Sequence, residues 1–231
     1  MTLPKYEHKL GEIRRMVHDV LQSIIDSSVL MLDAYESDDD EAFSHACFRA
    51  EAIKPLTDTI DNEIIRTLAL FSPEGSDLRY LLVYLKMTAE IDRIVRSMTK
   101  YCKSLNVASF ERYKLNPHRA SIAQLHKATL RILRYLADFF NGEGEQDANH
   151  LFRLIDIEES MTDDIFQVID KDIMLMVMNN PSYAVEYVKT IGTLRNLEKI
   201  ADRGVGIASL LRYAQDGGEL HLRHSGGTEE S

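Results

Sequence analysis

Apolar residues recur at steps of three and four along most of the chain, a spacing that places them on one face of an α-helix. An acidic run at residues 36–41 indicates a turn and the first turn of a new helix, where negative charge is favourable. Pro55 is expected to bend that helix, and Ser76 to cap the next one. The predicted helices of this first part cover residues 6–35, 40–70 and 77–105.

A second set of three helices follows further along the chain. They are predicted over residues 117–140 and 146–178, with a last helix that ends near residue 214. In each half a long second helix ends at a proline-containing turn, at Pro73 and at Pro181, and the third helix carries a related segment. We therefore predict an all-α protein of six long helices, arranged as two tandem three-helix bundles with pseudo-twofold symmetry. The expected domains are residues 1–110, residues 111–216 and a flexible C-terminal tail at 217–231.

The composition and charge of the chain argue against several classes of function. The 231 residues include 37 acidic and 27 basic side chains, a formal net charge of -10, which argues against a protein that binds nucleic acid through its phosphate backbone. No stretch approaches the length of an apolar membrane span, and Met1–Lys5 lack the apolar core of a signal peptide, so we expect a cytoplasmic protein without membrane insertion. Cys47 and Cys102 have no metal-ligand spacing and are interpreted as small buried hydrophobes in a reducing compartment.

Acidic residues occupy apolar positions in the second half. The apolar stripe of the helix over 146–178 contains Glu159, with Asp163 one turn further along. The last helix repeats this anomaly with Glu198 and Asp202. If the two pairs face each other, four carboxylates meet, and carboxylates removed from water need a proton or a cation. Oxygen ligands suit magnesium, manganese, calcium and iron, so these four residues are the candidate metal ligands.

The metal hypothesis has an alternative, in which the acids lie partly exposed and pair with Arg195, Lys199 or Arg203. The matching positions of the first half are taken as Ala50, Lys54, Asp92 and Arg96. There Asp92 can be neutralised by Arg96 at i,i+4, with Lys54 as a further partner. We therefore predict that any metal is bound in the second half alone.

No catalytic apparatus is recognisable, because there is no glycine-rich phosphate loop and the eight histidines are scattered. His221 and His224 fall in a polar, glycine-rich tail that is interpreted as a flexible end. In a metal-carboxylate bundle enzyme of the ferritin type, a histidine would follow each glutamate by three positions. Thr162 and Ala201 occupy those positions here, which weighs against that alternative.

Three segments carry a resemblance to a known family. Ser76–Arg79 open the third helix, Arg195–Asp202 read R-N-L-E-K-I-A-D, and Leu222–Gly227 contain R-H-S-G-G. They resemble the PhoU family of phosphate-signalling proteins, with its R-x-L/I-E-R-I-G-D signature and its R-H-x-G-G ending, and the likeness extends over nearly the whole chain. Tyr6–Met16 add to the resemblance. Ala201 replaces the usual glycine of the signature.

This resemblance implies a six-helix, non-enzymatic regulator of phosphate homeostasis in the cytoplasm. Such a protein links the ATPase subunit of a phosphate ABC transporter to a membrane sensor histidine kinase, and it restrains phosphate uptake and the phosphate-starvation response. The family carries iron or zinc on paired E/D-x-x-x-D motifs, which correspond here to Glu159, Asp163, Glu198 and Asp202. Ala50, Lys54 and Arg96 depart from the first-half motif.

A homodimer is expected, because bundles of this kind bury more surface by pairing. Three other interpretations stay open at this point. They are a ferritin-like enzyme, a divergent paralogue that serves another transporter, and a metal-free structural dimer.

Overall fold

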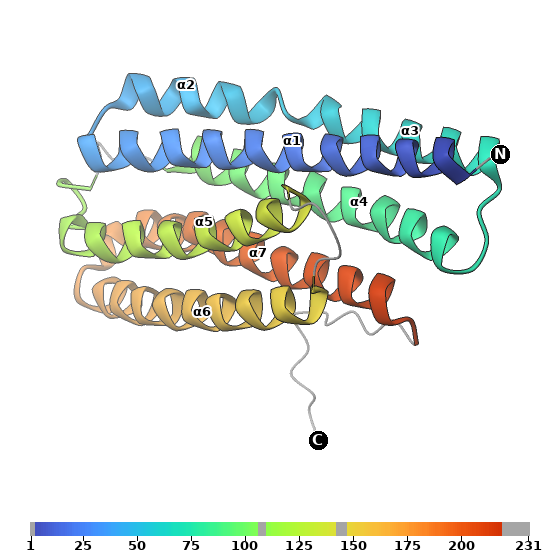
Figure 1. The fold of residues 1–231 in the computed structure, drawn as a ribbon. Helices are drawn as coiled ribbons and strands as arrows, with labels where there is room; N and C mark the ends of the chain where they lie inside the picture. The colour runs from blue at the N-terminus through green and yellow to red at the C-terminus, as the bar shows by residue number, and fades with distance from the viewer. Residues whose placement is uncertain (1–2, 106–109, 142–146, 219–231) are drawn as a thin grey trace.

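The computed structural model describes residues 3–105, 110–141 and 147–218, and every regular element within them is helical (Figure 1). This confirms the predicted all-α class. The α-helices are α1 (Leu3–Ser37), α2 (Asp40–Glu51), α3 (Lys54–Phe71), α4 (Gly75–Ser104), α5 (Arg119–Asn141), α6 (Ala148–Asn179) and α7 (Ala184–Asp216). Single turns of 3-10 helix precede α5 and α7, at Asn116–His118 and Pro181–Tyr183.

The predicted second helix is divided into α2 and α3 at Ala52 and Ile53. Pro55 is the second residue of α3, as expected for a residue that lacks an N–H and whose ring clashes with a preceding helical turn. The predicted acidic turn before α2 is confirmed, and it also caps the helix, because the Asp39 carboxylate accepts a hydrogen bond from the backbone N of Ala42 at 2.9 Å.

The predicted start of α4 is wrong by two residues. Glu74, not Ser76, holds the N-cap position, and α4 begins at Gly75. Gly75 has a φ of 59°, a left-handed conformation that glycine adopts without a Cβ clash. The chain therefore turns into the helix earlier than the pattern of capping residues suggests.

The helices of the two halves lie side by side (Figure 1). Within the second half, α6 packs along α7 and against α5; across the halves, α1 packs along α5 and α4 along α7. The halves thus share long helix–helix interfaces. Their proposed boundary near residue 110, and the division into two bundles, stay predictions.

A buried polar network lies where α1, α4 and α5 meet. The imidazole of His126, on α5, is fully enclosed, and its Nε2 lies 2.8 Å from the Ser28 hydroxyl of α1. The hydroxyl of Tyr101, on α4, lies 3.5 Å from Nδ1. Burial lowers the pKa of His126 to about 4, so the histidine is neutral in the folded protein at pH 7.

The interpretation of the two cysteines as separate small hydrophobes is wrong. Cys47, on α2, and Cys102, on α4, form a disulfide across a sequence separation of 55 residues. The packing of α2 against α4 brings the two sulfurs together, and no local pattern in the sequence signals that proximity.

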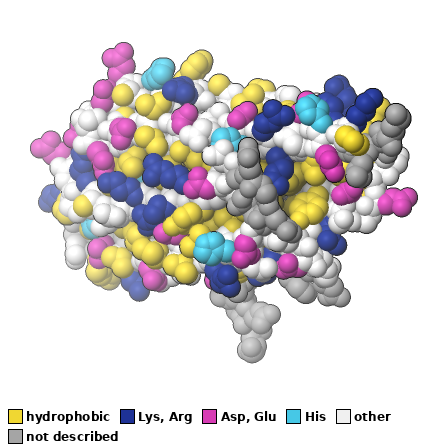
Figure 2. Space-filling model, in the orientation of Figure 1, with side chains coloured by type: hydrophobic (Ala, Val, Ile, Leu, Met, Phe, Trp, Pro, Cys, Tyr) yellow, Lys and Arg dark blue, Asp and Glu magenta, His cyan; other side chains and the backbone are white. Residues whose placement is uncertain are grey.

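No helix within the described ranges is both long and apolar enough to cross a membrane. Figure 2 shows acidic and basic side chains interspersed over one face of the molecule, with hydrophobic side chains exposed between them. The large exposed hydrophobic side chains include several on α6 and on the first turns of α7, namely Ile157, Met161, Val168, Met174, Leu175, Met178, Val185 and Val188.

Candidate functional site

The predicted acid pairs lie on neighbouring antiparallel helices. A short connection through Pro181–Tyr183 folds α7 back along α6. Between Glu159 and Asp163, Thr162 is fully buried, and its hydroxyl donates a hydrogen bond to the carbonyl of Glu158 at 2.7 Å. This burial fixes the rotation of α6, so the flanking carboxylates lie at the edge of the interface with α7 and are half-buried.

Three of the four predicted ligands come together. One carboxylate oxygen from each of Glu159, Asp163 and Asp202 lies within 4.8 Å of the other two, and we call these residues the acidic cluster. Glu198 is not part of it. Its Oε2 lies 3.8 Å from Nε of Arg195 on the same helix.

The electrostatics of the cluster favour a bound cation. Oδ1 of Asp163 is buried and has no hydrogen-bond partner among the residues that the structure describes. Burial, and then the negative charges of Asp202 and Asp164, raise the pKa of Asp163 above its ordinary value. The pKa of Glu198 is also raised by burial and by Asp202 and Asp163, which outweigh the opposing charges of Arg195 and Lys199.

A divalent cation would relieve both effects, because it supplies positive charge beside the carboxylates and a contact for the unpartnered Oδ1 of Asp163. The donor set consists of oxygen atoms, which suits hard or borderline metals. The residues present therefore fit a metal ion, with Glu159, Asp163 and Asp202 as ligands and Glu198 beside them.

Two ion pairs next to the cluster were missed by sequence reasoning. Arg131 of α5 binds Glu158 through contacts of 2.8 and 2.9 Å, which neutralises the carboxylate directly before Glu159. Arg203 was considered a partner for the candidate ligands, but its guanidinium lies 3.3 Å from the carboxylate of Glu90 on α4. Both pairs join different helices, so no spacing in the sequence indicates them.

The matching region of the first half contains the expected pair of Asp92 and Arg96, which form an ion pair at i,i+4 on α4. Ala50 is buried and offers no ligand. The expectation that Lys54 also neutralises Asp92 is wrong. Lys54 makes no ion pair with any described residue and instead lines a pocket beside Arg96, because α3 begins there and directs it toward α4.

His221, His224 and the segment Leu222–Gly227 lie outside the described residues. The same holds for most of the predicted tail.

The fold and the acidic cluster define a class of helical-bundle proteins with a carboxylate-rich interhelical site. Residues 13–105 match the family model of the PhoU domain. This match and the relatives described next support an assignment of the chain to the PhoU family.

Curated relatives carry names from phosphate transport. The chain is 26% identical over 170 residues to the phosphate-specific transport system accessory protein PhoU of Escherichia coli, covering 74% of this chain and 67% of that protein. It is 23% identical over 215 residues to a homologue of that accessory protein from Xylella fastidiosa, covering 90% of this chain and 85% of the other.

Solved structures share the fold. The phosphate transport system regulatory protein PhoU from Streptococcus pneumoniae superposes with a TM-score of 0.77 at 20% identity, covering 94% of this chain and 99% of that one. PhoU from Pseudomonas aeruginosa gives a TM-score of 0.63, also at 20% identity, covering 94% and 98%.

Proposed function

We propose that this protein is a non-enzymatic regulator of phosphate transport in the cytoplasm. In this role it couples the ATPase subunit of a phosphate ABC transporter to a membrane sensor histidine kinase, and it restrains phosphate uptake and the phosphate-starvation response. The observation that carries the proposal is the PhoU domain at residues 13–105. Curated relatives named as phosphate-specific transport system accessory proteins support it.

The exposed apolar side chains of α6 and α7 suit a protein partner. Val168, Leu175 and Met178 are separated by seven and three residues, so they share one face of α6 and are exposed. Exposed apolar surface of this kind is typical of protein interfaces. The transporter ATPase subunit is the partner proposed for this face.

A binding assay with the purified ATPase subunit tests the proposal. Leu175→Asp combined with Met178→Asp should weaken binding about tenfold or more, which corresponds to about 1.4 kcal/mol or more. The matched control is Ile65→Asp combined with Leu70→Asp, which places the same charges on exposed apolar positions of α3. Equal affinities for the wild type and both variants would exclude the α6 face, and no binding by the wild type would contradict the coupling function.

The acidic cluster is proposed to hold a divalent or transition metal ion, such as iron, zinc, manganese or magnesium, in the second half only. The unpartnered Oδ1 of Asp163 supports this assignment. When bound, the metal would stabilise the packing of α6 on α7 and neutralise the cluster. A homodimer is proposed as the assembled form.

Elemental analysis of protein purified without chelator tests the metal site. The wild type should contain about one equivalent of metal or more per chain, and Glu198→Ala combined with Asp202→Ala should lose it. Asp92→Ala is the matched control, since it removes a carboxylate of the first half that already pairs with Arg96. Equal metal content in all three proteins would show that the metal is bound outside the acidic cluster. If all three proteins are metal-free and equally folded, the proposed metal site is wrong.

A further inference from the structure

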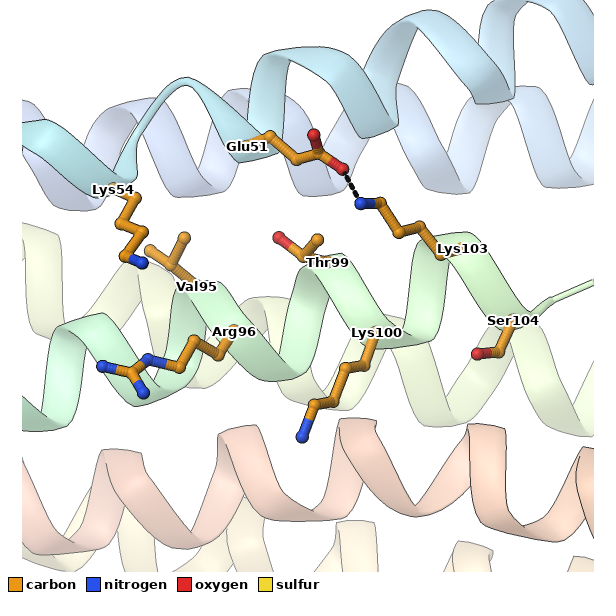
Figure 3. Close-up of a pocket in the computed structure, with 8 residues that line it drawn as sticks. All are labelled: Glu51, Lys54, Val95, Arg96, Thr99, Lys100, Lys103 and Ser104. Atoms are coloured by element: carbon orange, nitrogen blue, oxygen red, sulfur yellow. Dashed lines mark ion pairs between the residues drawn. The ribbon is translucent and has the colours of Figure 1, made fainter.

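A pocket of about 570 Å³ lies between α4 and the junction of α2 with α3. Four cationic side chains line it, Lys54, Arg96, Lys100 and Lys103, and we call it the basic pocket (Figure 3). Glu51 is the one carboxylate among its lining residues. In a protein with a formal net charge of -10, this concentration of positive charge is a local exception.

The basic pocket has more positive charge than its neighbours neutralise. Lys103 pairs with Glu51 across the pocket, and Arg96 pairs with Asp92 on its own helix. Lys54 and Lys100 form no ion pair with any residue in the described part of the chain. Like charges gathered in one depression repel each other and raise the local concentration of anions.

The backbone adds to this potential. α3 has 18 residues and begins at Lys54, so the positive end of its dipole lies at the edge of the basic pocket. Its N-cap residue, Ile53, provides no side-chain hydrogen bond to the first turn. The hydroxyl of Thr99, on the wall formed by α4, points toward the junction of α2 and α3 and is a further hydrogen-bond donor (Figure 3).

The walls are held in place before any ligand binds. The disulfide between Cys47 and Cys102 joins α2 to α4 close to Lys103, and the ion pair of Lys103 with Glu51 spans the same two helices. A site whose walls are fixed loses less conformational entropy when it binds a ligand.

We propose that the basic pocket binds an anion with several linked phosphoryl groups, such as tripolyphosphate or the phosphate chain of a nucleotide. The cations of α4 extend from Arg96 to Lys103, about 10 Å along the helix at 1.5 Å per residue. A single phosphate ion is too small to reach both ends, whereas a chain of phosphoryl groups spans them. Lysine and arginine donate charge-assisted hydrogen bonds to phosphate oxygens. This inference goes beyond the proposed function and does not depend on the acidic cluster.

Calorimetric titration of the full chain at low ionic strength tests the proposal, with sodium tripolyphosphate, inorganic phosphate, sulfate and ATP as separate probes. Tripolyphosphate should bind more tightly than phosphate or sulfate, and added salt should weaken it, because the contacts are exposed ion pairs. If ATP binds as tightly as tripolyphosphate or more tightly, the ligands of the basic pocket include nucleotides.

Lys54→Gln combined with Lys100→Gln should weaken tripolyphosphate binding about tenfold or more, since it removes the two unpaired cations. Both side chains are exposed, and the variant should fold like the wild type, which circular dichroism checks. The matched control is Lys5→Gln combined with Lys171→Gln, which makes the same change in net charge at exposed positions of α1 and α6 outside the pocket.

Three results would overturn the proposal. The first is no measurable binding of any probe by the wild type. The second is equal weakening in both double variants, which would indicate attraction to overall charge. The third is sulfate or inorganic phosphate binding as tightly as tripolyphosphate, which would indicate a site for a single ion. Metal content measured on the same samples reports on the acidic cluster separately, so failure of one proposal is distinguishable from failure of the other.

Discussion

Two of the three glycines of helix α7, Gly204 and Gly206, should respond oppositely to the same substitution. A Cβ added to Gly204 would overlap Cγ2 of Ile132 on α5 and lie 3.8 Å from Cγ2 of Ile155 on α6. A Cβ added to Gly206 meets nothing within 4 Å. Gly204→Ala therefore tests whether α7 approaches α5 as closely as the structure places it.

The expected free energies follow from two opposing effects. Replacing glycine by alanine inside a helix stabilises the folded state by about 1 kcal/mol. At Gly204 this gain is opposed by overpacking, which costs about 1–3 kcal/mol in a close-packed core. Ile132 and Ile155 are both fully buried, and a β-branched side chain in a helix has one strongly preferred χ1 rotamer, so Ile132 has little room to move.

Urea unfolding measures the difference. Gly204→Ala should lower the free energy of unfolding by up to about 2 kcal/mol, whereas Gly206→Ala should raise it by up to about 1 kcal/mol. The m-values should stay unchanged, so the transition midpoints can be compared directly. If Gly204→Ala is as stable as Gly206→Ala, the close approach of α7 to α5 is wrong.

Three further predictions concern buried and linked groups. His126 has a pKa of about 4 when folded and about 6.5 when unfolded, so the unfolded state binds the proton more tightly. The free energy of unfolding should be constant above about pH 6.5 and fall by up to about 3 kcal/mol toward pH 4. Urea titrations across this range check it, and an identical slope in His126→Gln would contradict it. Reducing the disulfide of Cys47 and Cys102, which are 55 residues apart, should lower the free energy of unfolding by up to about 4 kcal/mol. Unfolding with and without dithiothreitol measures this, and two free thiols in the untreated protein would refute it. Asp163→Asn should stabilise the protein in the presence of chelator at neutral pH, because the raised pKa of Asp163 shows that its charged form is disfavoured in the fold. The gain should disappear as pH falls below that pKa, and a loss of stability at neutral pH would contradict the prediction.

Local patterns in the sequence determined a large part of this protein. Apolar spacing identified every long helix, since an amphipathic face follows from 3.6 residues per turn. Pro55 predicted a bend in one helix over residues 40–70, and the structure has a break there between α2 and α3, because the proline ring clashes with a preceding helical turn. The ion pair of Asp92 and Arg96 was also predictable from the sequence. Residues four apart on a helix are neighbours, whatever the helix packs against.

Contacts between helices were decided by the tertiary structure. The sequence placed Glu159, Asp163, Glu198 and Asp202 on two helix faces, but the packing of α6 on α7 brought three of them together and left Glu198 beside them. The disulfide and the basic pocket arise in the same way, from the position of α2 and α3 relative to α4. The rotation and axial offset of one helix against another depend on how all the buried side chains interdigitate, and no repeat within either helix records that information.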